Sequence, residues 1–335
     1  MDRIPVIDIE PFLSASAEGR DVGRTAVPAA MREAAEEIGF FAIDGHGVPR
    51  TTMDALYTKA HAFFSLPLEQ KQRLAPPRPD YPRGYKAVGF EALAAGNAAV
   101  DQPPAPPDLK EYYHFGRADI PSGPYYTGEQ GRRHFFANRW PAHPAGFSEA
   151  ADAYYRAMES LSATLCRISA LALGLPEHFF DDKIDRHITA ARINYYPRQE
   201  DPPAEGQLRA GAHTDYGMLT ILSGESAPGL QVRTRSGDWV DVATDKYRFV
   251  CNIGDLLMRW TNDRWVSNTH RVINPPRELA RAASRVSIAF FHHPNYDAKI
   301  ECIPGCAGAA PPKYEPVLSG DFRDYKYAVT RAKAA

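Results

Sequence analysis

Hydrophobic residues in the first half of the chain recur every three or four positions, which is the spacing of one buried helix face. The longest such run covers residues 147–173, and Gly174-Leu175-Pro176 follows it as a helix terminator. Shorter helices are predicted over residues 31–38 and 53–64. Residues 5–9 and 40–43 predict short strands. Repeated prolines between residues 75 and 107 predict a long surface excursion.

The pattern changes in the second half, where short runs of β-branched, aromatic and aliphatic residues alternate with Gly, Pro, Asn and Asp. The predicted strands are residues 192–196, 218–222, 230–234, 239–242, 249–253, 265–272 and 285–292. Ser236-Gly237-Asp238 predicts a hairpin turn between two of them. Close spacing of short strands is typical of a β-sandwich or jelly roll. Helices followed by strands favour the α+β class, with helices packed on a β core.

Composition and charge narrow the function. The 335 residues are 44% apolar and 24% charged, which is ordinary for a globular protein. The formal net charge of −2 provides no basic field for nucleic acid or an anionic membrane. No apolar stretch approaches the ~18 residues of a membrane span, and the N-terminus does not resemble a secretory signal. We therefore expect a cytoplasmic protein whose partner is a small molecule.

His213 and Asp215 form the first candidate for chemistry. Two residues apart on an extended chain, their side chains project to the same side and can reach one cation. His270, on a later strand, could supply a third ligand. Two imidazoles and one carboxylate, with three coordination positions left open, form the facial triad of non-haem Fe(II) oxygenases. Alternatively, His-x-Asp is a common polar pair in a turn.

A second motif, Arg285-Val286-Ser287, begins another predicted strand. Arginine binds a carboxylate through two parallel hydrogen bonds, and serine adds a third donor beside it. The motif therefore predicts a site for the distal end of a dicarboxylic acid. An ordinary surface or structural ion pair is the alternative interpretation for Arg285.

Together these motifs resemble the isopenicillin N synthase-like branch of the iron(II)/2-oxoglutarate-dependent dioxygenases. The matching segments are Ile4-Pro5-Val6-Ile7-Asp8, Gly39-Phe40-Phe41, His46-Gly47-Val48, Phe63-Phe64, Leu66-Pro67, Glu69-Gln70-Lys71, Arg83-Gly84-Tyr85, Asn138, Trp140-Pro141, Asn194-Tyr195-Tyr196-Pro197, His213-Thr214-Asp215, Asn252-Ile253-Gly254-Asp255, His270-Arg271-Val272 and Arg285-Val286-Ser287. The resemblance implies a double-stranded β-helix, which is a distorted jelly roll, with N-terminal and flanking helices. It also implies an N-terminal module over residues 1–150 and a catalytic core with the long helix over residues 151–335.

The resemblance also implies roles for individual residues. The expected Fe(II) ligands are His213, Asp215 and His270. Arg285 and Ser287 are expected to bind the 5-carboxylate of 2-oxoglutarate, and Asn194 and Tyr196 match positions near its other end. Arg281 rivals Arg285 on spacing, because residues 275–284 lengthen this segment relative to plant members. Ascorbate is a further candidate cofactor.

Arg83 and Tyr85 are the candidates for substrate contact, because the family places their segment over the mouth of the site. The implied reaction uses O2 to oxidise a small molecule by hydroxylation, desaturation or cyclisation, with release of succinate and CO2.

Two alternatives stay open. The first is an Fe(II) oxidase without 2-oxoglutarate, such as isopenicillin N synthase or aminocyclopropane-carboxylate oxidase. The second is a non-catalytic jelly-roll protein with structural zinc, although such sites normally have four protein ligands and only three are found here.

Overall fold

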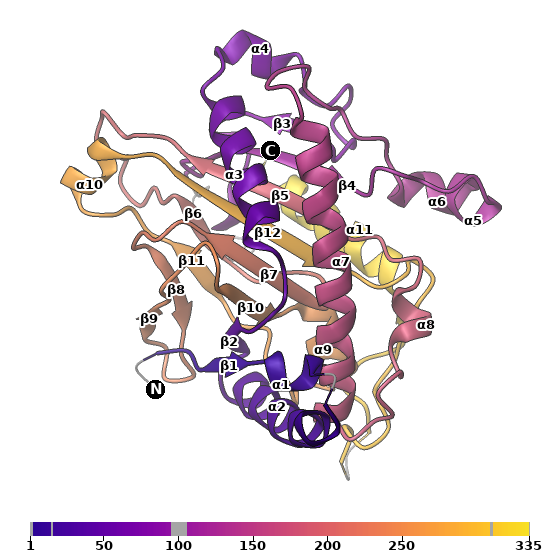
Figure 1. Ribbon diagram of the computed structural model, residues 1–335. Helices are drawn as coiled ribbons and strands as arrows, with labels where there is room; N and C mark the ends of the chain where they lie inside the picture. The colour runs from indigo at the N-terminus through magenta and orange to yellow at the C-terminus, as the bar shows by residue number, and fades with distance from the viewer. Residues whose placement is uncertain (1–2, 15, 95–105, 309–310, 335) are drawn as a thin grey trace.

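Two β-sheets face one another at the centre of the molecule, and helices cover the outer side of the larger sheet (Figure 1). The computed structural model describes residues 3–14, 16–94, 106–308 and 311–334. Within these ranges the expected α+β class and jelly-roll core are confirmed.

The larger sheet combines strands from both halves of the chain. Its order is β1 (Val6–Asp8), β2 (Phe40–Asp44), β10 (Phe249–Ile253), β7 (Leu219–Gly224), β12 (Arg285–His292), β5 (Ala190–Tyr196), β4 (Glu111–Gly116) and β3 (Gly84–Lys86). The facing sheet has the order β6 (Ala210–His213), β11 (His270–Val272), β8 (Leu230–Arg233) and β9 (Trp239–Asp241). A separate short pair joins β13 (Lys299–Ile300) to β14 (Val317–Leu318).

Alternation along the strands divides the interior into two regions. In β10, Phe249 and Cys251 belong to the core beneath the helices, whereas Val250 belongs to the smaller cluster between the sheets. Side chains alternate in the same way along β5, where Ile193 packs in the helix-side core and Asn194 lines an inner cavity. Each strand of the large sheet thus separates an apolar core from a partly polar interior.

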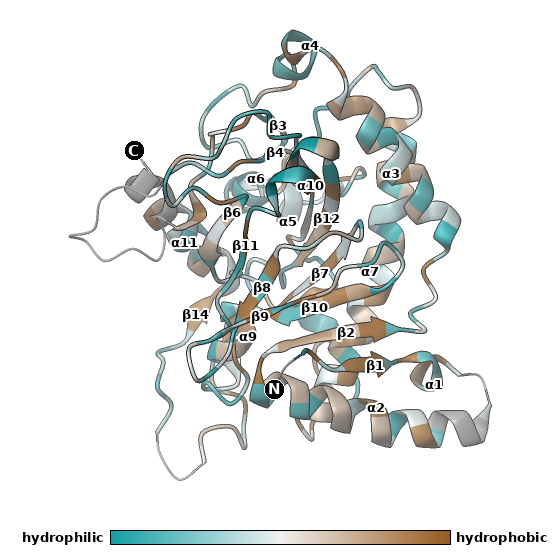
Figure 2. Ribbon diagram, turned by 90° about the vertical axis from the view of Figure 1, so that its left-hand side faces the viewer, coloured by the Kyte–Doolittle hydropathy of each residue, from teal (hydrophilic) through white to brown (hydrophobic). Residues whose placement is uncertain are grey.

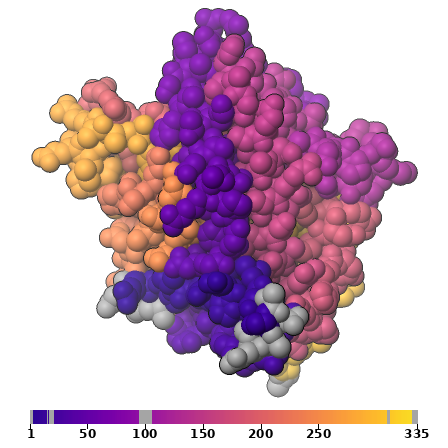
Figure 3. Space-filling model, in the orientation of Figure 1, coloured from indigo at the N-terminus to yellow at the C-terminus, as the bar shows by residue number. Residues whose placement is uncertain are grey.

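The helices have the following bounds: α1 (Glu10–Leu13), α2 (Ala17–Glu37), α3 (Arg50–Phe64), α4 (Leu68–Gln72), α5 (Pro124–Thr127), α6 (Glu129–His134), α7 (Phe147–Ala172), α8 (Asp181–Ile184), α9 (Asp255–Trp260), α10 (Arg277–Ala282) and α11 (Ser319–Ala334). Helix α7 packs against α2 and α3. The space-filling view shows α3 and α7 running side by side over the sheet (Figure 3). The covered strands β2 and β10 are coloured as hydrophobic in Figure 2. Within the described part of the chain, no helix combines the length and apolarity that crossing a membrane requires.

Most predicted elements are confirmed, although several bounds differ. The predicted helix over residues 147–173 matches α7, and the expected hairpin turn joins β8 to β9. The strand predicted over residues 265–272 is wrong for its first half, because Trp265 is buried in the helix-side core and pairing begins only at His270.

The predicted surface excursion over residues 75–107 is wrong at β3, which forms the edge of the large sheet by pairing with β4. Residues 95–105 of that prediction lie outside the described ranges. Helix α11 has no counterpart in the sequence prediction.

A buried ion pair links α4 to the large sheet. Lys71 Nζ lies 2.8 Å from Glu111 Oε2, and the two side chains are only 8% and 7% exposed. Tyr85 donates its hydroxyl hydrogen to the same carboxylate. Removing one partner of a buried pair leaves an uncompensated charge, which typically costs more than the pair itself contributes.

We therefore expect Lys71→Met to lower the free energy of unfolding by about 3–5 kcal/mol, measured by urea denaturation. Adding Glu111→Gln should restore much of this loss, because no lone charge then remains. Arg73→Met is the control, since Arg73 and Glu69 form an exposed pair whose loss should cost less than about 1 kcal/mol. Equal losses in the single and double variants would contradict this account.

Candidate active site

Three potential metal ligands meet at one end of the smaller sheet. Strands β6 and β11 pair antiparallel, which sets His213 directly opposite His270. Asp215 follows His213 by two residues and turns its carboxylate toward both imidazoles, with oxygens 4.0 Å from His213 Nε2 and 3.8 Å from His270 Nε2. One ligand atom from each residue lies within 4.8 Å of the others. This spacing fits a single cation, and Asp215 and His270 are both buried.

Backbone carbonyls fix the orientation of both imidazoles. The Nδ1 atom of His213 lies 2.8 Å from the carbonyl oxygen of Gly211, and Nδ1 of His270 lies 3.2 Å from that of Asn268. Because a carbonyl only accepts, each Nδ1 carries the hydrogen and each Nε2 presents a lone pair to the common centre. Burial, together with the neighbouring His270, lowers the pKa of His213 to about 3, so its imidazole is neutral at pH 7. Neutral imidazole is the form that binds metal.

Asp215 is held ionised by its surroundings. Burial works to raise its pKa, but His270, His213 and hydrogen bonds from Thr220 and Asn252 outweigh burial and lower it. Asn252 Nδ2 donates to Asp215 Oδ2 at 2.8 Å. One carboxylate and two imidazoles form the donor set that fits Fe(II) with positions left open.

The predicted cosubstrate residues line the same inner cavity as the three ligands. Register pairing places Arg285 opposite Tyr196 and Ser287 opposite Asn194, so all four side chains point inwards from β12 and β5. The cavity measures about 70 Å³. All seven residues predicted to bind the metal or the cosubstrate therefore line one cavity.

Arg285 lines this cavity and is only 3% exposed. Its guanidinium donates to Thr244 Oγ1 at 3.1 Å and lies over the Tyr196 ring at 5.5 Å. The rival, Arg281, lies on α10 and is exposed to solvent. The insertion over residues 275–284 thus forms a surface helix, and Arg285 rather than Arg281 lines the inner cavity with the candidate metal ligands.

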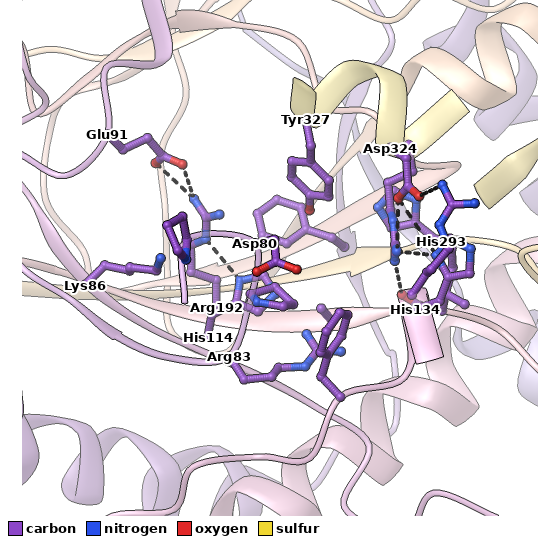
Figure 4. A pocket seen from close by; sticks show the side chains of 18 of the residues that line it. Asp80, Arg83, Lys86, Glu91, His114, His134, Arg192, His293, Asp324 and Tyr327 are labelled. Carbon is purple, nitrogen blue, oxygen red and sulfur yellow. Dashed lines mark hydrogen bonds and ion pairs between the residues drawn. The ribbon is translucent and has the colours of Figure 1, made fainter. Parts of the chain in front are cut away.

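The two predicted substrate residues have different surroundings. A larger cavity of about 590 Å³ lies beside the inner one, and Arg83 and Lys86 line it (Figure 4). Tyr85 lies outside the described lining of both cavities, because alternation along β3 turns it into the helix-side core, where it contacts Phe63. Tyr85 is 1% exposed, and its neighbour Lys86 faces the cavity instead.

Sequence reasoning missed the residues that join the two cavities. Arg192 and Phe291 line both. Arg192 Nη1 lies 3.0 Å from Glu91 Oε2, and its guanidinium lies 4.2 Å from the centre of the Tyr112 ring. The sequence could have indicated Arg192, because it lies two residues before Asn194 on the same strand, so both side chains project from the same face of β5.

The fold and this geometry define a jelly-roll protein with a candidate two-histidine, one-carboxylate metal site and a buried arginine in the same cavity. Two family models match the chain: the N-terminal region of non-haem dioxygenases in morphine synthesis over residues 4–143, and the 2OG-Fe(II) oxygenase superfamily over residues 188–294. The 2-oxoglutarate-Fe(II) type oxidoreductase hxnY of Emericella nidulans is 35% identical, over 98% of this chain and 91% of that protein. The chain belongs to the 2-oxoglutarate- and iron(II)-dependent oxygenases.

Other relatives agree with this assignment. Homoarginine-6-hydroxylase 2-ODD-233 of Oryza sativa is 33% identical, over 95% of this chain and 94% of that protein. A full-length Neurospora crassa protein crystallised with alpha-KG superposes with a TM-score of 0.82 at 30% identity, covering 98% of this chain and 96% of that one. The JOX2 crystal structure with 2OG, Fe and JA gives a TM-score of 0.76 at 28% identity, covering 98% of this chain and 85% of that one. The protein is thus an oxidoreductase that uses Fe(II) and 2-oxoglutarate.

The hydrogen bond from Asn252 generates a test of the metal site. Residues that orient a ligand typically contribute 10- to 100-fold to metal affinity, so we expect Asn252→Ala to weaken Fe(II) binding by about that factor. Anaerobic titration with Fe(II) would measure it. Thr214→Val is the control, because Thr214 lies between two of the candidate ligands but donates to Asp255 instead. Equal affinities in the wild type and Asn252→Ala would refute an orienting role.

Proposed function

We propose that this enzyme hydroxylates a small molecule bound in the larger cavity, with His213, Asp215 and His270 holding the iron. Arg285 and Ser287 bind the distal carboxylate of 2-oxoglutarate. The observation that carries this proposal is the single buried cavity in which both groups of residues meet. When bound, the iron activates O2 and couples decarboxylation of 2-oxoglutarate to oxidation of a C–H bond.

The protein side chains bind and orient the reactants and exclude water. Arg285 and Ser287 fix one end of the cosubstrate, and Asn194 and Tyr196 lie opposite them on β5 to contact the remainder. Arg285 is already held by Thr244, so its guanidinium is pre-oriented for a carboxylate. Burial of this pocket strengthens charge-assisted hydrogen bonds, because little water competes for them.

The substrate enters from the larger cavity, which joins the inner one at Arg192 and Phe291. We assign substrate selection to the N-terminal half, residues 1–150, because its strands β3 and β4 supply Lys86, Tyr112 and His114 to the cavity wall. The core within residues 151–335 supplies every predicted iron and cosubstrate residue.

Hydroxylation is the favoured outcome because relatives from plants and fungi carry it in their names, including homoarginine-6-hydroxylases and the proline hydroxylase buaE of Petromyces alliaceus. The substrates in these names are those of the relatives themselves. The 2-oxoglutarate-dependent relatives also argue against the two alternatives raised by the sequence, an oxidase without 2-oxoglutarate and a non-catalytic zinc protein.

Arg285→Gln tests the cosubstrate assignment. Hydrogen bonds to a charged group contribute roughly 1.5–3 kcal/mol each, so loss of one or two should raise the KM for 2-oxoglutarate at least about tenfold. Succinate formation at varied 2-oxoglutarate measures this change, with His213→Ala as the expected inactive reference. Arg281→Gln, on the exposed α10, should behave as wild type. A normal KM in Arg285→Gln, or succinate formation by His213→Ala, would refute the assignment.

A further inference from the structure

The larger cavity has more cationic than anionic side chains. Among the described residues that line it, seven are lysine or arginine and three are aspartate or glutamate. All three of these carboxylates already form ion pairs with lysine or arginine. Glu91 lies 3.0 Å from both Arg192 and Lys110, as measured between its Oε2 and their side-chain nitrogens. A site with this imbalance favours an anion.

The other two carboxylates are also paired at the cavity wall. Asp324 Oδ2 lies 2.8 Å from Arg133 Nη2, and Asp324 Oδ1 lies 3.6 Å from Arg323 Nη2. Asp80 Oδ1 lies 2.8 Å from Arg78 Nε. No described carboxylate therefore remains to neutralise a further cation in this cavity.

Arg83 is a lining cation that these pairings leave without a carboxylate. Its side chain lines the cavity, and the residue is 5% exposed. No hydrogen bond or ion pair joins its guanidinium to another described residue, and its Nε is buried without a partner. In Figure 4 the interaction lines run between other residues and leave Arg83 without one. Burial lowers the pKa of Arg83 to about 10, so the guanidinium still carries its charge at pH 7.

The fold makes room for this guanidinium. Gly116 on β4 lies beside it, and a Cβ at that position would be 2.3 Å from Arg83 Nη2. Arg277, by contrast, donates to the carbonyl oxygens of Gln199 and Asp201. A buried, charged guanidinium without a protein acceptor is energetically unfavourable unless water or a ligand in the cavity supplies one.

We propose that Arg83 binds a carboxylate of the substrate, so that the enzyme acts on small organic acids; this inference rests on the proposed function. Gly116 pairs with Ala190, four residues along β5 from Asn194, or about 13 Å at ~3.3 Å per residue. The substrate carboxylate is therefore bound at the outer end of the cavity. The part of the substrate that carries the carbon to be oxidised extends inwards past Arg192 and Phe291.

The experiment compares acids with neutral isosteres. Wild-type protein is saturated anaerobically with Fe(II) and 2-oxoglutarate, so that the Arg285 site is filled, and is titrated by calorimetry with hexanoate, hexanamide, phenylacetate and phenylacetamide. We expect each acid to bind at least about tenfold more tightly than its amide. Arg83→Gln should abolish this preference. Arg78→Gln removes a cavity cation that has its own carboxylate and should keep the preference.

A stability measurement separates ligand binding from a structural role. Because Arg83→Gln removes a buried, unpaired charge, the ligand-free variant should unfold at a temperature no lower than that of the wild type. Hexanoate should raise the unfolding temperature of wild type but not of the variant. A structural arginine would instead give a variant that unfolds several degrees lower.

Three results would overturn the inference: equal binding of acids and amides to wild type, an acid preference retained by Arg83→Gln, or no binding of either acid. Failure of the proposed function is distinguishable, because the loading titrations with Fe(II) and 2-oxoglutarate, made before any acid is added, would then show no binding. The acid preference and its dependence on Arg83 require no turnover, because every measurement is made without oxygen.

Discussion

Alternation along paired strands is the constraint on which the rest of the structure depends. Strands β5 and β12 turn Ile193 and Ile288 outward into the core beneath α3 and α7. The intervening residues, among them Asn194 and Ser287, face inward toward the candidate metal site. A slip of one residue in this pairing would exchange the two sets, burying polar groups in the apolar core. The apolar packing under the helices therefore fixes the register of the site.

Polar and charged side chains in this interior are stable only where each has a hydrogen-bond or ionic partner. Burial works to raise the pKa of Glu91, but Arg192 and Lys110 hold it well below the ordinary value, so the carboxylate stays ionised within a cationic wall. Asp215 is held ionised in the same way by imidazoles and an amide. Arg83 differs from these groups, because the described residues around it leave its guanidinium unpaired. The contrast separates side chains that complete the fold from one that awaits a ligand.

The chain builds its cavities from segments far apart in sequence. The candidate metal and cosubstrate residues come from the C-terminal half, whereas β3 and β4 of the N-terminal half extend the same sheet and wall the larger cavity. Relatives named for different activities match nearly the whole chain. One fold can host different substrates when the residues around a shared centre vary, so the function of this protein depends on its own cavity wall.

By itself, the sequence determined the helix over residues 147–173 and the short inner strands, and it indicated His213, Asp215, His270 and Arg285 as candidates, because strong periodicity and local motifs carry that information. It did not predict β3 or the face of the sheet on which Tyr85 lies, since whether a short edge segment pairs, and which face it presents, depends on β4 alongside it. Only the tertiary structure decided that Arg83 is buried without a hydrogen-bond partner among the described residues and that Arg192 lines both cavities. Those properties come from neighbours distant along the chain, which local spacing does not encode.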